Sequence, residues 1–306
     1  VEAAWGYPVV PPADAEMEAL QLALATAREH LQRFALDLPL LLPQPGVAAD
    51  PKWLRDAPVM FTPAPGSNAA ALRATLEKLS GWLERRLFGL PTAEWLQCWR
   101  ADPAAWLAVW SAGRDHGLAR WLAAVRPRAQ ALSLPCRPLA LLEAGEAGLR
   151  ELNVALEADP DLAEHPLWRG APAETGPWTR QGRADAGVAD AWRRLGSRLA
   201  DLAALAQGES LAAGAATLAE GVGVAWTEMS RGLLVHWIRL EPGRPPGEGS
   251  RAADYRVFAP TEWNFHPAGA FGRALASGAL DVEDTRLAAL ALDPCVQFDV
   301  VEGHHA

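Results

Sequence analysis

The sequence predicts a mainly α-helical protein with a small antiparallel β-sheet, an α+β fold. Apolar residues recur three and four positions apart through most of residues 14–220, which is the period of an amphipathic helix. From Gly221 the period changes to about two, as in a strand with one buried face. The chain has 306 residues and 50% hydrophobic content, enough for one large core. We therefore expect one domain, 1–306, with a helical part at 14–220 and a hairpin and tail at 221–306.

Charge and composition exclude several classes of protein. The net charge of −9, without a basic stripe, argues against a nucleic-acid partner. There is no run of 18 apolar residues that would span a membrane, and the start of the chain lacks the pattern of a secretory signal. Three cysteines without a CxxC pair do not suggest disulfides or a zinc knuckle, so we expect a cytoplasmic protein. Because the chain begins at Val1 rather than Met, a missing N-terminal segment stays an open alternative.

Four amphipathic helices are expected in the first 130 residues. Asp14 and Asp102 each precede an apolar stripe and have a side chain that can cap a helix N-terminus, and Thr92 is expected to do the same. Gly89 follows the second stripe, where a left-handed residue commonly ends a helix. The prolines of residues 43–66 indicate an extended connector. The predicted helices cover residues 14–38, 67–88, 92–99 and 102–125.

The second half of the chain is predicted to contain three further helices and two strands. Residues 233–241 and 254–260 alternate between apolar and polar side chains, and the Pro- and Gly-rich segment between them favours an antiparallel pair. We interpret Arg193, Arg194 and Arg198 as the solvated face of a helix. The predicted helices cover residues 140–158, 184–206 and 282–293.

Several residues with useful chemistry have simpler structural interpretations. Cys98 lies among Trp and Leu residues and Cys136 lies between two prolines, so we interpret both as structural rather than as metal ligands. Glu29 and His30 are adjacent on the first helix and diverge by about 100°, so at most one of them faces a site. We interpret His30 as a surface or hydrogen-bonded core histidine. The 14 Trp residues are expected mainly in the core or lining grooves.

Three motifs in the last quarter of the chain point to a family. Arg231 and a glycine lead into the strands, Pro260 opens the turn PTEWN, and Cys295 ends the triplet DPC. In this order they resemble the C-terminal part of the nickel-iron hydrogenase large subunit, where A-P-R-G, P-[ST]-T-W-N and D-P-C-x-x-C segments surround the metals. The segments at 27–42 and 174–180 also resemble that family. The resemblance implies a helical bundle like that of the large subunit.

The chain departs from this family at the metal-binding cysteines. Phe298 stands where the family has its second tail cysteine, and an N-terminal CxxC is absent from the sequence. Since a nickel site needs several thiolates, we expect no nickel and no catalysis. The resemblance still implies groups that bind an Fe(CN)2(CO) fragment: Cys295 as the thiolate, Arg231 and Thr261 as donors to the cyanides, and Pro260 packing beside them.

Other residues near the motifs have open roles. Glu262 replaces a hydroxyl residue of the family turn, and it serves as an iron ligand, a proton acceptor or a surface carboxylate. Imidazole is a ligand for iron, so His266, His304 and His305 are candidate ligands as well. For His304 and His305 the alternative is a frayed C-terminus.

This combination resembles the HupK/HoxV group of hydrogenase maturation proteins. The resemblance implies a non-catalytic scaffold that holds Fe(CN)2(CO) transiently and passes it to the hydrogenase large-subunit precursor, with other maturation proteins as partners. Two alternatives stay open. One is a divergent hydrogenase large subunit, which would need three more thiolates. The other is a structural subunit with a vestigial metal pocket, as in the large-subunit relatives of respiratory complex I. The sequence sets neither the oligomeric state nor which hydrogenase is served.

Overall fold

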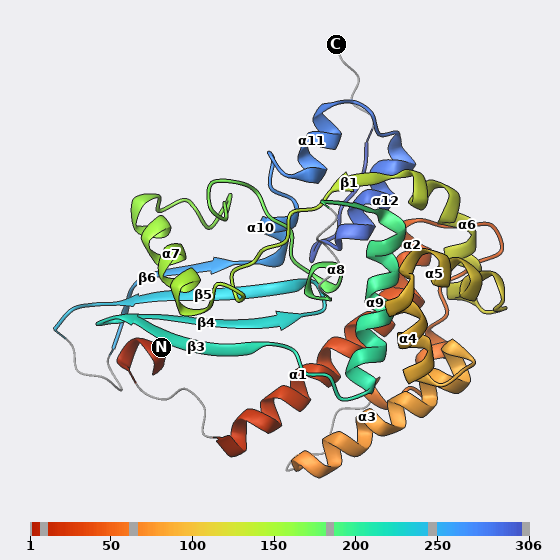
Figure 1. The fold of residues 1–306 in the computed structure, drawn as a ribbon, viewed down its shortest axis with the longest axis horizontal. Helices are drawn as coiled ribbons and strands as arrows, with labels where there is room; N and C mark the ends of the chain where they lie inside the picture. Colours follow the sequence, from red (N-terminus) through yellow and green to blue (C-terminus); the bar gives the residue numbers. More distant parts are fainter. Residues whose placement is uncertain (1, 7–11, 61–66, 182–186, 244–249, 302–306) are drawn as a thin grey trace.

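A bundle of helices lies beside a four-stranded antiparallel sheet in a computed structural model of the chain (Figure 1). The structure describes residues 2–6, 12–60, 67–181, 187–243 and 250–301. The α+β fold class predicted from the sequence is confirmed. Among the described residues, no helix combines the length and the apolar character needed to cross a membrane.

The helices fall mainly in the first two thirds of the chain. They are α1 (Pro12–Gln32), α2 (Leu38–Leu41), α3 (Ala69–Leu83), α4 (Thr92–Ala101), α5 (Pro103–Ala112), α6 (Gly117–Ala131), α7 (Gly145–Ala158), α8 (Pro177–Arg180), α9 (Ala191–Ala206), α10 (Pro260–Asn264), α11 (Ala270–Ala276) and α12 (Val282–Leu292). Two π-helical turns, Arg33–Asp37 and Glu84–Phe88, extend α1 and α3. Short 3-10 turns lie in the first 60 residues, at Glu2–Trp5, Pro51–Leu54 and Pro58–Met60.

The helix α9 forms the centre of the bundle. It packs against α1, α3, α4, α5, α6, α8 and α12, and every residue of the helix except Arg193 is buried. The expectation of a solvated arginine face is therefore wrong for Arg194 and Arg198, which are only 2% and 1% exposed. Both arginines find buried oxygen acceptors on neighbouring segments, which compensates for the loss of water around their charge.

In the first half of the chain, the structure differs from the sequence prediction at two helix caps and at one helix end. The helix α1 begins two residues before Asp14 and continues through the first π-helical turn and α2, beyond the expected end at Leu38. Pro39 does not stop the helix, because it directly follows the π-helical turn, where the backbone hydrogen-bond pattern changes. Thr92 does not cap α4, because its hydroxyl donates to the carbonyl of Ser80 at 3.1 Å.

Two helices, α5 and α6, replace the single helix expected at residues 102–125. Asp102 caps α5 as predicted, since its carboxylate accepts the N–H of Ala105 at 3.1 Å. The chain then leaves the helix at Gly113, and Nδ1 of His116 caps α6 by accepting the N–H of Ala119 at 3.3 Å. The break is polar and short, so the apolar periodicity on either side did not reveal it.

The helices expected at 140–158 and 184–206 begin later than predicted. The first is α7, which starts at Gly145. The second is α9, which starts after a short strand, β2 (Val188–Asp190), paired with β1 (Ser133–Pro135). Asp190 caps α9 by accepting the N–H of Arg193 at 2.7 Å. The beginning of the second prediction, at residues 184–186, lies outside the described residues.

The larger sheet has the strand order β3-β4-β5-β6. Its strands are β3 (Ala213–Ala219), β4 (Val222–Met229), β5 (Gly232–Leu240) and β6 (Ala252–Phe258). The predicted pair at 233–241 and 254–260 is confirmed as β5 and β6. The strands β3 and β4 were not predicted, because their many Ala and Gly residues give little alternation.

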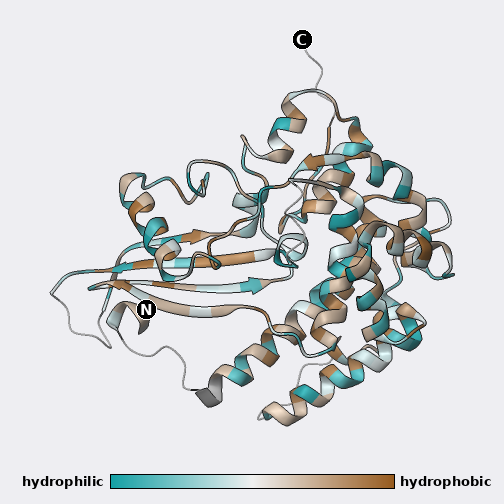
Figure 2. Cartoon of the chain, in the orientation of Figure 1, coloured by the Kyte–Doolittle hydropathy of each residue, from teal (hydrophilic) through white to brown (hydrophobic). Residues whose placement is uncertain are grey.

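One face of this sheet packs under α7 and the loops around it. Val224, Val235, Trp237 and Phe258 point into a second core, which they share with the leucines of α7. Figure 2 shows the apolar stretch along β5 that contributes to this core. The sheet therefore holds the start of β5, and the Arg231 that precedes it, in a fixed place beside the bundle.

The close packing of α9 against its neighbours generates a prediction about stability. A methyl group on Gly196 of α9 would come within 2.5 Å of the Trp99 ring and 2.6 Å of Leu107. We expect Gly196→Ala to lower the free energy of unfolding by about 1–3 kcal/mol, because both neighbours are fully buried and must shift. Chemical denaturation measures the change.

Gly117→Ala is the matched control, because a methyl group there meets no atom within 4 Å. We expect this control to change the free energy of unfolding by less than about 0.5 kcal/mol. Equal effects of the two substitutions would contradict the packing of α9 described above.

Candidate functional site

The motifs predicted from the sequence meet at the C-terminal end of α12. Thr261, in the first turn of α10, donates its hydroxyl hydrogen to the sulfur of Cys295 at 3.0 Å. The same oxygen lies 3.4 Å from the backbone nitrogen of Cys295. Pro260, the first residue of α10, is buried, and Cys295 itself is exposed. Two residues 34 positions apart thus form one exposed thiol site.

A buried carboxylate lies two residues before the exposed thiol. Asp293 ends α12 with a left-handed backbone, φ 59°, and is 5% exposed. Nε of Arg33 donates to it at 2.6 Å, while Nε of Arg198 and Nε of Arg231 lie 3.6 and 3.9 Å from its oxygens. Burial raises the pKa of Asp293, but the charges of Arg198, Arg33 and Arg231 outweigh that effect and hold the pKa below its usual value.

Arg231 is held between Asp293 and the first helix. Its Nη1 lies 3.2 Å from the carboxylate of Glu29, which also accepts the hydroxyl of Ser230. The following glycine has φ 127°, and a methyl group there would come within 2.8 Å of the backbone nitrogen of Gly176. This close approach explains why a glycine follows Arg231: only Gly takes this backbone conformation without strain.

Arg198 is a site residue that the sequence analysis missed. Its Nη2 donates to the carbonyls of Leu290 and Ala291 at 2.6 and 2.9 Å, which caps the C-terminal end of α12. Burial lowers the pKa of Arg198 to about 10; Asp293 opposes this shift, and the charges of Arg33 and Arg231 add to it. In the sequence, Arg198 is an arginine within a long apolar helix. This pattern fits a surface arginine as well as a buried one, so it did not indicate a site residue.

A second buried charge network supports the same region. Nε2 of His30 lies 2.7 Å from Asp201 on α9, and Arg180 donates to both oxygens of that carboxylate at 2.9 and 2.8 Å. Burial raises the pKa of Asp201, but Arg180 and His30 hold it well below its usual range. The interpretation of His30 as a hydrogen-bonded core histidine is confirmed. Glu29, its neighbour, faces Arg231 instead, as their divergence on the helix requires.

The segment at 174–180 has a structural role on both sides of its turn. Glu174 receives two hydrogen bonds from Arg194, at 2.9 and 2.7 Å, in a buried bidentate pair. Arg180 pairs with Asp201 on α9 and also with Glu228 on β4. These pairs connect α8 and α9 to the sheet.

Not all predicted ligands join the Cys295 site. Glu262 lies half-buried on α10 beside Thr261. His266 is 8% exposed, and its Nδ1 accepts the N–H of Ala268 at 3.0 Å. Burial and the nearby His165 lower the pKa of His266. His304 and His305 lie outside the described residues. Within the described ranges, no three side chains of the types His, Cys, Asp and Glu are grouped to hold a metal ion.

Of the other two cysteines, Cys136 belongs to the core, as predicted for a structural residue. Cys136 is 4% exposed, and burial together with the nearby Glu174 raises the pKa of its thiol to about 12. A thiol with that pKa stays protonated at neutral pH and is a poor metal ligand. Cys98 lies half-buried on α4.

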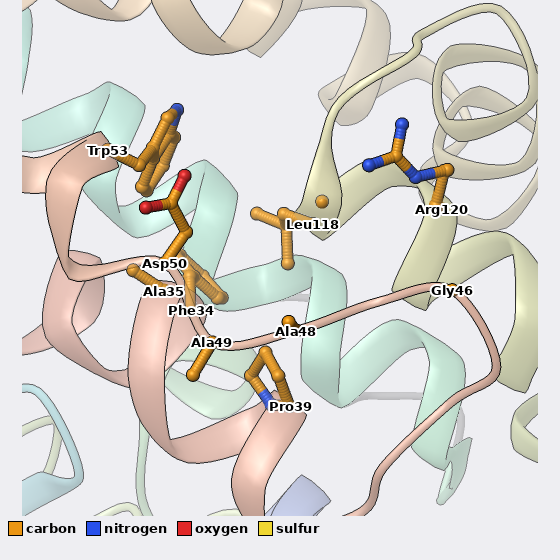
Figure 3. A pocket seen from close by; sticks show the side chains of 11 residues that line it. Phe34, Ala35, Pro39, Gly46, Ala48, Ala49, Asp50, Trp53, Leu118 and Arg120 are labelled. Atoms are coloured by element: carbon orange, nitrogen blue, oxygen red, sulfur yellow. The ribbon is translucent and has the colours of Figure 1, made fainter.

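A cavity in the helical bundle lies away from the predicted site residues. It has a volume of about 320 Å³ and is lined by Phe34, Pro39, Trp53, Leu118 and Arg120, with the carboxylate of Asp50 at its edge (Figure 3). None of the predicted ligands lines it. Its lining is mostly apolar and has no soft ligand, so it is not suited to iron.

Comparison with known proteins identifies the family. No family model matches the chain. The protein "Hydrogenase expression/formation protein HoxV" of Cupriavidus necator is 38% identical, over 92% of this chain and 76% of its own length. "Hydrogenase expression/formation protein HupK" of Bradyrhizobium diazoefficiens is 31% identical, over 79% of this chain and 70% of its own. HupK of Rhizobium leguminosarum bv. viciae is 37% identical over 49% of this chain and 44% of its own length.

These similarities define the class of protein as a hydrogenase expression/formation protein. Within this class, the chain belongs to the HoxV/HupK family. The family predicted from the motifs around Arg231, Pro260 and Cys295 is therefore confirmed.

The shared carboxylate of the site generates a prediction on pH dependence. Because the pKa of Asp293 is lower in the folded protein than its unfolded value of about 3.9, its ionised form stabilises the fold above about pH 4. This contribution is lost as the pH falls through the folded value. At neutral pH we expect Asp293→Asn to lower the free energy of unfolding by about 3–5 kcal/mol, since three arginines lose their common counter-charge.

Asp115→Asn is the control, because Asp115 is 92% exposed in its pair with Arg120. We expect its effect to stay below about 1 kcal/mol. Urea denaturation at neutral pH and near pH 3 measures both variants. The difference between wild type and Asp293→Asn should shrink at the lower pH. A difference that grows there would contradict the assigned role of Asp293.

Proposed function

We propose that this protein is a non-catalytic scaffold that holds an Fe(CN)2(CO) fragment transiently and passes it to the precursor of a nickel-iron hydrogenase large subunit. Membership of the HoxV/HupK family supports a role in hydrogenase maturation. The observation that carries the finer proposal is the contact between the exposed Cys295 and Thr261, next to the arginines around Asp293.

A single exposed thiolate suits a temporary iron ligand. Thiolate sulfur is a soft ligand that binds low-spin iron well. The Thr261 hydroxyl donates to the Cys295 sulfur at 3.0 Å, which orients the sulfur relative to the turn at the start of α10. Because one protein ligand is far weaker than the four thiolates of a closed site, the fragment can be released to an acceptor that offers more sulfur ligands.

The charges around the thiol are complementary to bound cyanide. Cyanide ligands are anionic hydrogen-bond acceptors, and charged donors bind such acceptors most strongly. Arg231 has a side chain that is 26% exposed, so its guanidinium is partly open to solvent while its Nε lies 3.9 Å from Asp293, two residues before the thiol. Thr261 supplies a hydroxyl, and the buried Pro260 fixes the turn on which that hydroxyl lies.

The site lacks the groups that a nickel-iron catalytic centre requires. Such a centre uses four thiolates, and in the described residues Cys295 is not grouped with other cysteine, histidine or acidic ligands. Phe298 packs partly buried against the main core instead of offering a sulfur. This supports a carrier for iron alone rather than a divergent catalytic subunit. We place its action in the cytoplasm, where Cys295 stays reduced.

Substitution of the thiol tests the proposal. We expect Cys295→Ser to lose at least about nine tenths of the iron that co-purifies with the protein from a hydrogenase-producing host without oxygen, because a hydroxyl is a poor ligand for low-spin iron. Metal analysis per protein chain measures the loss, and restoration of hydrogenase activity in cells lacking the protein gives a second readout.

Cys98→Ser is the matched control, since Cys98 lies half-buried on α4 and belongs to none of the motifs. It should keep the iron content of the wild type. If Cys295→Ser also keeps its iron, Cys295 is not the ligand and the proposed site is wrong.

A further inference from the structure

A small cavity lies on the inner side of Asp293. It is formed where α8, α9, α10 and α12 meet the turn at residues 230–232, and its volume is about 20 Å³. Trp178, Arg198, Arg231 and Asn264 are among the residues that line it. Since one water molecule needs roughly 10–15 Å³, a cavity of this size accepts a ligand of one or two heavy atoms.

Three buried N–H donors of the lining residues have no acceptor in the described part of the chain. They are Nη1 of Arg198, Nε of Arg231 and Nε1 of Trp178. The Arg198 side chain is 98% buried, because its relative exposure is 2%, and Trp178 is 6% exposed. A buried polar group without a partner costs about 1–3 kcal/mol, so three around one cavity call for a common ligand.

The other polar groups of the cavity are already occupied. The amide of Asn264 accepts from the nitrogen of Thr175 and donates to its carbonyl, both at 2.9 Å. Both oxygens of Glu174 accept from Arg194. The cavity thus offers an excess of donors, which matches a ligand that only accepts hydrogen bonds.

The balance of charge also favours an anion. The one ion pair that Arg198 forms within the described ranges is with Asp293 at 3.6 Å, and that carboxylate is shared with Arg33 and Arg231. Arg33 and Arg231 have second partners in Asp37 and Glu29, so Arg198 is the arginine of the three with the fewest counter-charges. Burial lowers the pKa of Arg198 to about 10, and the charges of Arg33 and Arg231 add to this effect against Asp293. A bound anion would place a second negative charge beside Arg198.

We propose that this cavity binds a small monovalent anion, of the size of a halide or cyanide, through the N–H groups of Arg198, Arg231 and Trp178. The site itself requires no iron. Arg231 lines this cavity and is also the residue that the proposed function assigns to a cyanide of the iron fragment, so that function implies one cyanide as the anion bound in the cell. That identification of the natural ligand rests on the proposed function.

Bromide binding to the iron-free protein tests the site directly. The thermal midpoint of unfolding is measured while bromide replaces gluconate at constant ionic strength. A ligand that binds only the folded protein raises the stability of that protein as the ligand concentration rises. Crystals grown in bromide locate the ion by anomalous scattering. We expect bromide in the cavity, within hydrogen-bonding distance of Nη1 of Arg198, and a bromide-dependent rise in the thermal midpoint.

A matched pair of tryptophan variants makes the test specific. Trp178→Phe removes one donor but keeps an aromatic ring, and it should weaken bromide binding about tenfold. Trp95→Phe also removes a buried indole N–H without a partner, but Trp95 does not line the cavity, so its bromide affinity should equal that of the wild type.

The outcomes separate this inference from the proposed function. A water molecule in the cavity at high bromide, or equal bromide binding by the two variants, would overturn the anion site even if iron still binds at Cys295. Conversely, bromide binding with no iron on the wild-type protein would leave the anion site intact and remove the cyanide of an iron fragment as its natural ligand.

Discussion

The buried carboxylate of Asp293 connects three parts of the chain that are distant in sequence. Arg33 follows α1, Arg198 belongs to the central helix α9, and Arg231 precedes β5, yet all three reach the same side chain. A lone carboxylate in this position would be costly to bury, and so would any of the arginines. Their shared burial therefore fixes the end of α12 and places Cys295 at the surface two residues later.

The sequence analysis recovered the fold class and the family, but not the interior of the bundle. The strands β5 and β6 alternate clearly, and the Thr261 and Cys295 motifs were recognised as parts of one site, which the 3.0 Å contact supports. Arg198 was misinterpreted because an arginine in an apolar helix is usually solvated. Only the tertiary structure shows that the carbonyls at the end of α12 satisfy it.

The same reason explains the other differences. The strands β3 and β4 are rich in small residues, so their identity depends on pairing with neighbours rather than on a local pattern. Gly113 interrupts a helix whose two halves share one periodicity. Glu29 and His30 were expected to diverge, but their partners, Arg231 and Asp201, lie about 170 to 200 positions away in sequence. Contacts of this range are set by the fold.

The chain belongs to the HoxV/HupK family, and we propose that its exposed thiol, the neighbouring hydroxyl and the buried cations serve a carrier rather than a catalyst. Infrared spectroscopy of the protein, purified without oxygen from a hydrogenase-producing host, tests this account most directly. We predict two stretching bands of metal-bound cyanide and one of metal-bound carbonyl, together with iron and without nickel. A spectrum without these bands, from protein shown to support maturation in the same cells, would contradict the role as a carrier of the iron fragment.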